Sequence, residues 1–467
     1  MKDKYVLFRI LPLFLLVLIT LLIGCSNPPK LLEKEKAYGT RYDKYAIFHR
    51  IAEVDRGLGL KYPGFLVGIE KGYRENIDPN NTYDVVVQLK KDKTSERNYK
   101  RVKDILGDRK ITFVSHIAQY RLKSGINGNP YNGIPYIEEN VLYNAYEKNF
   151  ITSNAYTDSS TALDKLEEQI AEIKDNERYT HIFLYCMGWN TDQQESLRNY
   201  NSLLGLIIEN YEDKEPFRPL FVGISWPSLW KWKFFKYTGI ISSYFTKADD
   251  ADEVGLIWGN RILREILIPL KKEKEIPLIL IGHSLGARVL TRALFSTPLV
   301  PTEATDDIRP QDVDLVIGLE GAFSVRRFIH DKGLEGYPYE RFKKYARKFV
   351  FTWSKHDSAN SAPVIYGTRY IGGKPGHKYT KKFENIFTHF TIKTDGTDNN
   401  YNIIFAGVQD EVKWKQGFGD SSKVSIVDAS ELIYYHPYLK GGNAHNDIYT
   451  PGIADFIWDC ISNLKNN

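Results

Sequence analysis

The sequence predicts an α/β fold in which a mostly parallel sheet is covered by helices on both faces and is preceded by an N-terminal extension. From about residue 150 onward, short apolar runs alternate with longer segments whose apolar residues recur at helical spacing. The short runs are apolar nearly throughout, which is typical of strands covered on both faces. Helices on each side of a parallel sheet are the simplest way to provide that cover.

The elements follow one another regularly within residues 151–467, the predicted main domain. Strands are expected at 181–187, 220–225, 277–281, 313–319, 348–353 and 424–427. Helices are expected at 160–173, 195–211, 253–270 and 285–295. A last helix begins after Thr450, which can cap it, and Pro451 suits its first position because the missing N–H is not needed there.

Residues 25–150 are harder to interpret, and we assign them as a tether followed by an extension of unclear role. The segments 82–90 and 110–120 have the composition of strands and are candidates to extend the sheet. Glycines within 57–72 and within 125–133 predict loops.

The first 24 residues have the pattern of a secretory signal peptide. Lys2, Lys4 and Arg9 precede an apolar stretch at 10–23, which is shorter than the roughly 20 residues needed to span a membrane. The final Leu-Ile-Gly-Cys, ending at Cys25, resembles the cleavage box of bacterial lipoproteins. That resemblance implies a lipid-bearing Cys25 and a protein held on a membrane of the bacterial envelope, outside the cytoplasm. An uncleaved anchor is the alternative.

Composition and spacing argue against several other classes of function. The formal net charge of +5 is small for 467 residues, and no basic run or nucleic-acid-binding motif is present, so no nucleic-acid partner is expected. No H-E-x-x-H or comparable ligand spacing occurs, so we expect no metal and no cofactor. Cys186 and Cys460 both lie in apolar segments, which favours two buried thiols over a disulfide.

The motif "GHSLG" at 282–286 provides a candidate nucleophile. It stands between a predicted strand and a predicted helix, and a serine on such a tight turn is held in a strained backbone that projects its hydroxyl from the sheet. The flanking glycines allow strand and helix to approach closely. We therefore predict that Ser284 is a catalytic nucleophile.

With this motif, the chain resembles the α/β-hydrolases, and in particular bacterial predicted serine esterases that carry H-G-Y-N after one strand and S-W-P-S after the next. The corresponding segments here read M-G-W-N at 187–190 and S-W-P-S at 225–228. The likeness covers about residues 160–467 and does not extend to 26–150. It implies a Ser-Asp-His triad and an acyl-enzyme intermediate.

A serine needs a neighbouring imidazole to accept its proton, and in this fold the acid and the histidine follow the serine in the chain. His445 lies between the last predicted strand and the last helix, where the fold presents its base; His436 is the rival. Asp357, in the turn after the strand at 348–353, stands where the resembling family has its acid, and Glu320 is the alternative. His283 should point away from the nucleophile.

Acyl transfer also needs N–H groups directed at the developing oxyanion. In this fold one is the backbone N–H of the residue after the nucleophile, here Leu285. By the resemblance the other belongs to Trp189. Met187 replaces the usual histidine of the motif, but a backbone donor does not require that side chain, and the flexible methionine can fill the space. A distorted oxyanion hole remains the alternative.

The sequence thus predicts a lipid-anchored serine hydrolase that cleaves a small-molecule or lipid carboxylic ester. The alternative is a non-catalytic binding or scaffold lipoprotein that keeps the fold without the activity, and Met187 is its best support. Fold alone names neither the substrate nor its acyl length, nor the oligomeric state.

Overall fold

The structure is a computed structural model, and it describes residues 60–73, 100, 103–106, 110–122, 137–145, 155–173, 179–189, 191, 193–209, 217–228, 240–295, 312–329, 345–361, 369–394, 403–405, 423–434 and 444–464. The signal peptide and Cys25, the segments 82–90 and 125–133, and His436 lie outside these residues.

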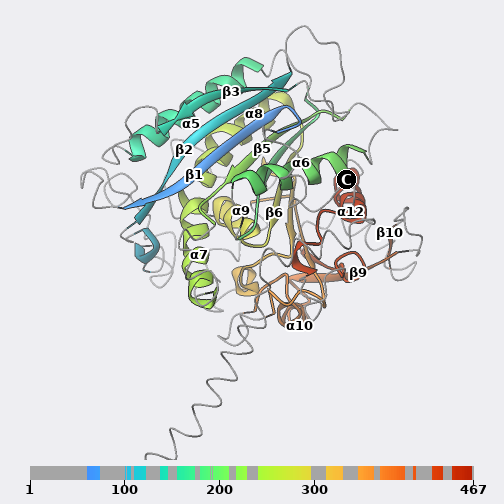
Figure 1. Cartoon of the computed structure of the whole chain (residues 1–467). Helices are drawn as coiled ribbons and strands as arrows, with labels where there is room; N and C mark the ends of the chain where they lie inside the picture. Colours follow the sequence, from blue (N-terminus) through green and yellow to red (C-terminus); the bar gives the residue numbers. More distant parts are fainter. Residues whose placement is uncertain are drawn as a thin grey trace, which may run out of the picture.

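One large sheet organises the described part of the molecule (Figure 1). It has 11 strands in the order β10-β9-β11-β8-β7-β6-β4-β5-β1-β2-β3. From β9 across to β1 every neighbouring pair is parallel, while β10, β2 and β3 add antiparallel strands at the two edges. The predicted α/β fold with a mostly parallel sheet is confirmed.

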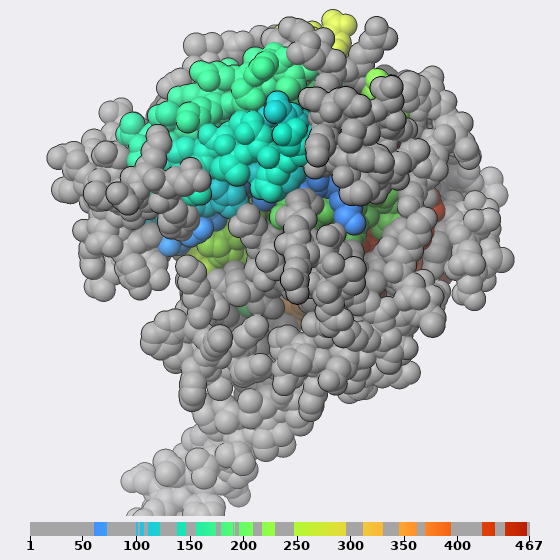
Figure 2. Space-filling model, turned by 45° about the horizontal axis from the view of Figure 1, so that its top comes forward, coloured from blue at the N-terminus to red at the C-terminus, as the bar shows by residue number. Residues whose placement is uncertain are grey.

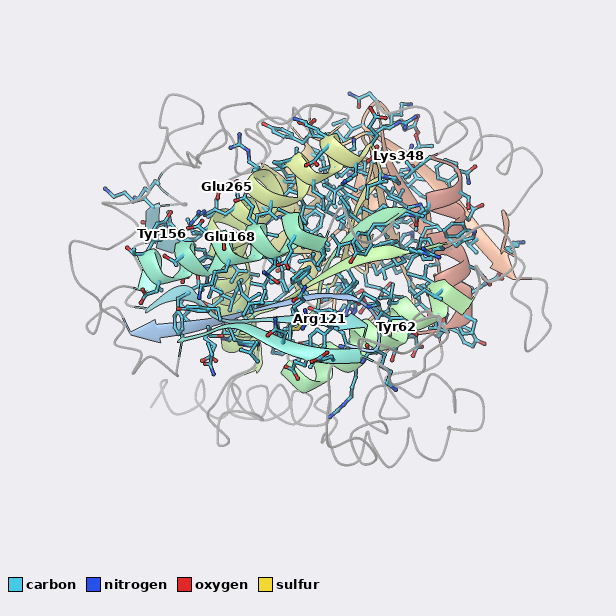
Figure 3. All side chains as sticks on the ribbon, turned by 90° about the horizontal axis from the view of Figure 1, so that it is seen from above. Tyr62, Arg121, Tyr156, Glu168, Glu265 and Lys348 are labelled. Carbon is cyan, nitrogen blue, oxygen red and sulfur yellow. The ribbon has the colours of Figure 1, made fainter. Side chains whose placement is uncertain are left out.

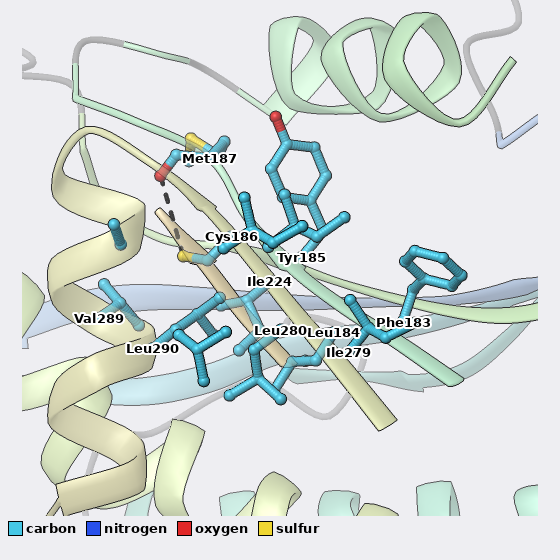
Figure 4. Close-up of a cluster of buried hydrophobic side chains, with 14 of the residues drawn as sticks. Phe183, Leu184, Tyr185, Cys186, Met187, Ile224, Ile279, Leu280, Val289 and Leu290 are labelled. Carbon is cyan, nitrogen blue, oxygen red and sulfur yellow. Dashed lines mark hydrogen bonds between the residues drawn. The ribbon is translucent and has the colours of Figure 1, made fainter. Parts of the chain in front are cut away.

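The strands occupy the following residues: β1 Gly64–Tyr73, β2 Lys110–Leu122, β3 Ile137–Asn144, β4 His181–Cys186, β5 Pro219–Ser225, β6 Leu278–His283, β7 Leu315–Leu319, β8 Lys348–Trp353, β9 Phe387–Thr394, β10 Ile403–Phe405 and β11 Val424–Asp428. Every residue of β4, β5, β6, β7 and β8 is buried, which explains why these runs are apolar on both faces. Figure 4 shows part of this core, where side chains of β4 and β6 meet Val289 and Leu290 of the helix after β6.

Helices cover both faces of the sheet. On one face lie α5 (Ala155–Ile173), the continuous helical segment of α7 (Ile240–Val254), η8 (Gly255–Gly259), η9 (Ile262–Leu267) and α8 (Ile268–Lys274), and α9 (Leu285–Phe295). Figure 3 shows α5 and the segment carrying Glu265 on the same side. On the other face α6 (Gln193–Glu209) contacts α12 (Pro451–Ser462). A short α10 (Lys374–Thr380) precedes β9.

The long helical segment differs from its predicted bounds of 253–270. It begins at residue 240, and its middle is wound as π-helix at η8 and η9. A Cβ on Gly255 would lie 2.4 Å from the carbonyl oxygen of Val289, so glycine is what lets this segment approach α9 closely.

One loop prediction in the N-terminal extension is wrong, because residues 64–73 form β1. The glycines that suggested a loop are places where a neighbouring chain comes too close for a side chain. A Cβ on Gly68 would lie 1.8 Å from the His116 ring of β2, and one on Gly64 would lie 2.3 Å from the Phe221 carbonyl oxygen of β5. The predicted strand at 110–120 is confirmed as part of β2.

The strands of the extension are built into the main sheet. β1 pairs with β5 on one side and β2 on the other, and Figure 2 shows residues of β2, β3 and α5 together on the molecular surface. Lys71 of β1 forms buried ion pairs with Asp250 at 2.6 Å and Glu253 at 3.0 Å, and Glu253 also accepts the backbone N–H of Thr112 at 2.6 Å. Ion pairs as well as apolar packing therefore hold the sheet and the helices together at this end.

Two further predictions can be compared with the described residues. Cys186 and Cys460 are both free and buried, as expected. No helix in the described ranges is long and apolar enough to cross a membrane.

Candidate active site

The candidate site lies where the order of the strands reverses. The chain passes from β4 outward to β5 and then returns to β6 on the opposite side of β4. In open parallel sheets, the carboxyl ends of the strands beside such a reversal leave a crevice in which ligands bind. Gly188 follows β4 and Ser284 follows β6, so both stand at this crevice.

Ser284 forms a strained turn between β6 and α9. Its φ is 53°, a left-handed value that costs a non-glycine residue about 1 kcal/mol or more. The turn is tight because a Cβ on Gly282 would lie 2.4 Å from the Ala287 Cα, and one on Gly286 would lie 2.0 Å from the Cys186 carbonyl oxygen. Both glycines of the motif are therefore required by backbone contacts, as the sequence suggested.

Ser284 is more enclosed than a projecting hydroxyl would be. Only 3% of its surface is exposed.

Asp357 and His445 meet at the same edge of the sheet. His445 lies in the 3₁₀ turn η15 (Ala444–Asn446), and its Nδ1 donates to Asp357 Oδ2 at 2.9 Å. Asp357, in the turn after β8, is 1% exposed and accepts the backbone N–H of Asn360 at 3.1 Å. Burial alone would raise the pKa of Asp357, but the imidazole of His445 and these hydrogen bonds lower it to about 2. The carboxylate is therefore held ionised beside the imidazole.

His283 holds the loop that carries His445, a contact that sequence reasoning missed. Its Nε2 lies 2.9 Å from the backbone oxygen of His445, and the two imidazole rings have centroids 4.8 Å apart. Burial and the neighbouring imidazole lower the pKa of His283 to about 3, so the ring is neutral and Nε2–H donates to that oxygen. Its position next to Ser284 in the sequence was the available signal.

The imidazole of His445 packs beside the residue that precedes Ser284, but no hydrogen bond joins it to the serine among the described residues. His283, adjacent to Ser284 in the chain, packs against His445. Between these described residues, however, Ser284 Oγ makes no hydrogen bond to His445. Such contacts are often long in unliganded hydrolases and tighten when substrate binds.

The loop after β4 runs directly against the nucleophile. A Cβ on Gly188 would lie 2.9 Å from His283 Nδ1 and 3.2 Å from Ser284 Cβ, so this position needs glycine. The next residue, Trp189, is partly buried against the core, and Leu285 on the other side is fully buried at the start of α9. Leu285 is therefore the residue next to Ser284, and Trp189 follows the glycine that lies close to it.

Met187 fills the place of the usual histidine as a core residue. It is fully buried at the end of β4, as Figure 4 shows. Its backbone oxygen accepts the indole N–H of Trp226 at 3.0 Å, and its sulfur lies 3.8 Å from Ser228 Oγ, whose proton is donated to the Thr191 carbonyl oxygen at 2.6 Å. The backbone N–H of Thr191 in turn donates to Ser228 Oγ at 3.0 Å. The S-W-P-S turn thus holds the loop after β4 without a histidine.

Glu320, the alternative acid, also reaches His445. It follows β7, is fully buried, and its Oε2 lies 3.7 Å from His445 Nδ1, farther than Asp357 Oδ2. Glu320, Asp357 and His445 each offer a possible metal-ligand atom, and these atoms lie within 4.8 Å of one another. Because the Nδ1 proton already joins His445 to Asp357, we interpret the three as a hydrogen-bonded acid–base group.

Comparison with known proteins adds little to this geometry. No protein-family model and no curated protein matches the chain. Among solved structures, TT1662 from Thermus thermophilus is similar at a TM-score of 0.29 and 12% sequence identity, over 62% of this chain and 91% of that one. A likeness of this degree supports no functional argument, so function has to be inferred from the residues themselves.

Proposed function

We propose that the chain is a serine hydrolase that cleaves a carboxylic ester through an acyl-enzyme. Ser284 is the nucleophile, His445 the general base, and Asp357 the acid that orients the imidazole. The observation that carries this proposal is the 2.9 Å hydrogen bond from His445 Nδ1 to a buried, ionised Asp357, at the sheet edge where Ser284 adopts its strained turn.

The reaction follows from these positions. His445 Nε2 takes the proton of Ser284 as Oγ attacks the acyl carbon, and the carbonyl electrons move onto the oxygen. Collapse of this intermediate breaks the bond to the alcohol, which leaves with the proton from Nε2. Water, deprotonated by the same nitrogen, then attacks the acyl-enzyme, and collapse returns the proton to Ser284 and releases the acid.

The N–H groups of Leu285 and Trp189 are proposed to stabilise the oxyanion. Leu285 follows Ser284 at the start of α9, and Trp189 follows Gly188, on which a Cβ would lie 3.2 Å from Ser284 Cβ. Packing of Met187 supports this assignment, because the loop is held by Trp226 and Ser228 rather than by a histidine.

We further propose that Cys25 carries lipid, which places the enzyme on a membrane of the bacterial envelope with its ester substrate, a small molecule or a lipid. Mass spectrometry of the N-terminal peptide tests this: the peptide should begin at Cys25 and carry acyl mass. In a Cys25→Ala variant the protein should leave the membrane fraction. An unmodified peptide that begins at Met1 would contradict the anchor.

A fluorophosphonate probe tests the catalytic proposal directly, because it reacts with an activated serine. Wild-type protein should be labelled, and peptide mapping should find the adduct on Ser284. Ser284→Ala should abolish labelling, whereas Ser160→Ala on α5 should leave it intact. Absence of labelling in the folded wild-type protein would overturn the proposal.

A non-catalytic binding protein is the second candidate, and one observation favours it. Ser284 is 3% exposed and is not hydrogen-bonded to His445 in the described structure. In that case the pocket would bind an ester or acid without cleaving it. Binding of a short-chain ester with no labelling and no hydrolysis would select this alternative.

A further inference from the structure

Glu320 occupies a position of the same kind as Ser284, one strand away. It follows β7 as Ser284 follows β6, and its φ of 52° is also left-handed. Two hydrogen bonds with side chains hold the backbone here: the Glu320 N–H donates to Thr352 Oγ1 at 3.0 Å, and Asn360 Nδ2 donates to the Glu320 carbonyl oxygen at 2.5 Å. Strain maintained in this way at a site edge is typical of a residue with a role there.

Most of the charged groups around the carboxyl group of Glu320 are acids. It is fully buried, and one of its oxygens lies within 4.8 Å of a carboxylate oxygen of Asp357. Among the described residues, no N–H or hydroxyl group donates to either of its oxygens. The other charged groups acting on it are His445 at 3.7 Å, Asp447 in the same loop, and Asp428 at the end of β11. Three of its four charged neighbours are therefore acids.

Two buried carboxyl groups this close together cannot both be ionised beside one imidazole without a large electrostatic cost, so a proton shared between them is the favoured arrangement. Asp357 is the ionised partner, because it receives the N–H groups of both His445 and Asn360. Glu320 receives neither. Burial and the charge of Asp357 raise the pKa of Glu320 well above its usual range, in agreement with this division.

We propose that Glu320 is a positioning residue of the active site: at neutral pH it is a carboxylic acid that donates its proton to Asp357 and so fixes Asp357 toward His445. This inference rests on the proposed function for its catalytic consequence, although not for its protonation state. Glu320 gives no proton to the substrate during turnover, because its proton stays between the two carboxyl groups.

The proton shared by Glu320 and Asp357 also affects His445, the proposed base. An ionised Glu320 would place a second negative charge 3.7 Å from His445 Nδ1, the nitrogen that already donates to Asp357. One shared proton leaves a single negative charge at 2.9 Å, with the neutral acid behind it.

Infrared difference spectroscopy tests the protonation state without requiring activity. At pH 7.5 the wild-type protein should show the carbonyl stretch of a protonated carboxyl group, and the wild-type minus Glu320→Gln spectrum should isolate it. Ser284→Ala should keep the band. So should Glu265→Gln, which removes a glutamate ion-paired with Arg261. A difference spectrum without this band would overturn the proposal whether or not the protein labels with fluorophosphonate.

Kinetics then test the positioning role. Glu320→Gln keeps a hydrogen-bond donor, so kcat should stay within about 3-fold and the acid limb of kcat/KM within about half a pH unit. Glu320→Leu lacks the donor, and kcat should fall at least about 10-fold at unchanged KM. A fall of the acid-limb pKa by about one unit or more in Glu320→Gln would show that Glu320 is ionised and overturn the proposal. So would stoichiometric metal that is lost in this variant.

Discussion

Charged groups are arranged in opposite ways at the two edges of the parallel sheet. At the amino edge, a hollow of about 560 Å³ is lined by residues at the starts of β4, β6, β7 and β8, and two of its acids have basic partners. Lys271 pairs with Asp314 at 3.3 Å and Lys272 with Asp312 at 3.2 Å. At the carboxyl edge, Glu320 is buried against another acid, and two residues have left-handed backbones.

This difference indicates where chemistry is expected. A hollow alone is weak support for a site: at the amino edge Asp312 and Asp314 are paired with lysines, and the left-handed residue in the lining, Glu275, ends helix α8 rather than a strand. At the carboxyl edge, by contrast, two residues at strand ends have strained backbones, and carboxyl groups of like charge lie close together. Such costly features persist in a folded protein only when the surrounding structure enforces them. Substitutions at matched positions on the two edges can sharpen or break this comparison.

The largest difference is expected between two buried aspartates. Asp357→Asn should lower kcat about 10⁴-fold, because an amide favours the wrong imidazole tautomer. Asp314→Asn at the amino edge should leave kcat within about 2-fold and instead lower stability by roughly 1–2 kcal/mol, since Asp314 accepts the Leu278 N–H at 2.9 Å. Steady-state kinetics and urea unfolding measure both. Comparable loss of activity in the two variants would remove the contrast.

Gly188→Ala should reduce turnover about 10²- to 10³-fold, the range for a displaced oxyanion donor. The added methyl group would meet His283 and Ser284 at 2.9 and 3.2 Å, pushing the loop away from the nucleophile. Gly205→Ala on α6 is the control, because its methyl group would meet only the mobile hydroxyl end of Tyr62, at 2.7 Å. Labelling rates should fall in the first variant and persist in the second. Equal rates would contradict the placement of this loop.

Acid should destabilise the protein through His283. Its folded-state pKa of about 3 lies below the ordinary value of 6.5, so the unfolded chain binds the extra proton between these values. This contribution to stability is complete above pH 6.5 and is lost as the pH falls toward 3, at up to about 1.4 kcal/mol per pH unit. Urea unfolding of His283→Gln should show a correspondingly weaker pH dependence. An unchanged slope would mean that the imidazole is not buried as described.

The smallest effect is expected at the rim of the amino edge. Lys272 is 44% exposed, so its pairing with Asp312 is screened by water. Lys272→Ala should lower the free energy of unfolding by less than about 1 kcal/mol and leave fluorophosphonate labelling unchanged. A drop in labelling would show that the amino edge influences the site.

The fold was predictable wherever burial on both faces made the strands apolar. This held for β4 through β8 and β11, whose predicted positions agree with the structure to within a few residues. It did not hold for β1, where glycines accommodate close neighbours, or for β9 at Phe387–Thr394, which was not predicted because polar residues alternate along it. Local composition predicts burial well, but it does not predict where another segment of the chain approaches closely.

The site divides in the same way. Ser284, Asp357 and His445 could be proposed from their order along the chain, and the structure places Asp357 and His445 in contact. The contact of His283 with the His445 backbone, and that of Glu320 with Asp357, depend on which strands become neighbours in space. No local pattern encodes that, so their roles emerge only from the topology in which β7 lies between β6 and β8.

The placement of β1 also determines how the molecule would respond to a mechanical load. Because β1 lies between β5 and β2 rather than at a border, tension on the chain before residue 60 would pull along two rows of inter-strand hydrogen bonds at once. Bonds loaded side by side in shear must fail together. Any pull from the N-terminal side would therefore meet one of the most resistant parts of the sheet before it could disturb the serine several strands away.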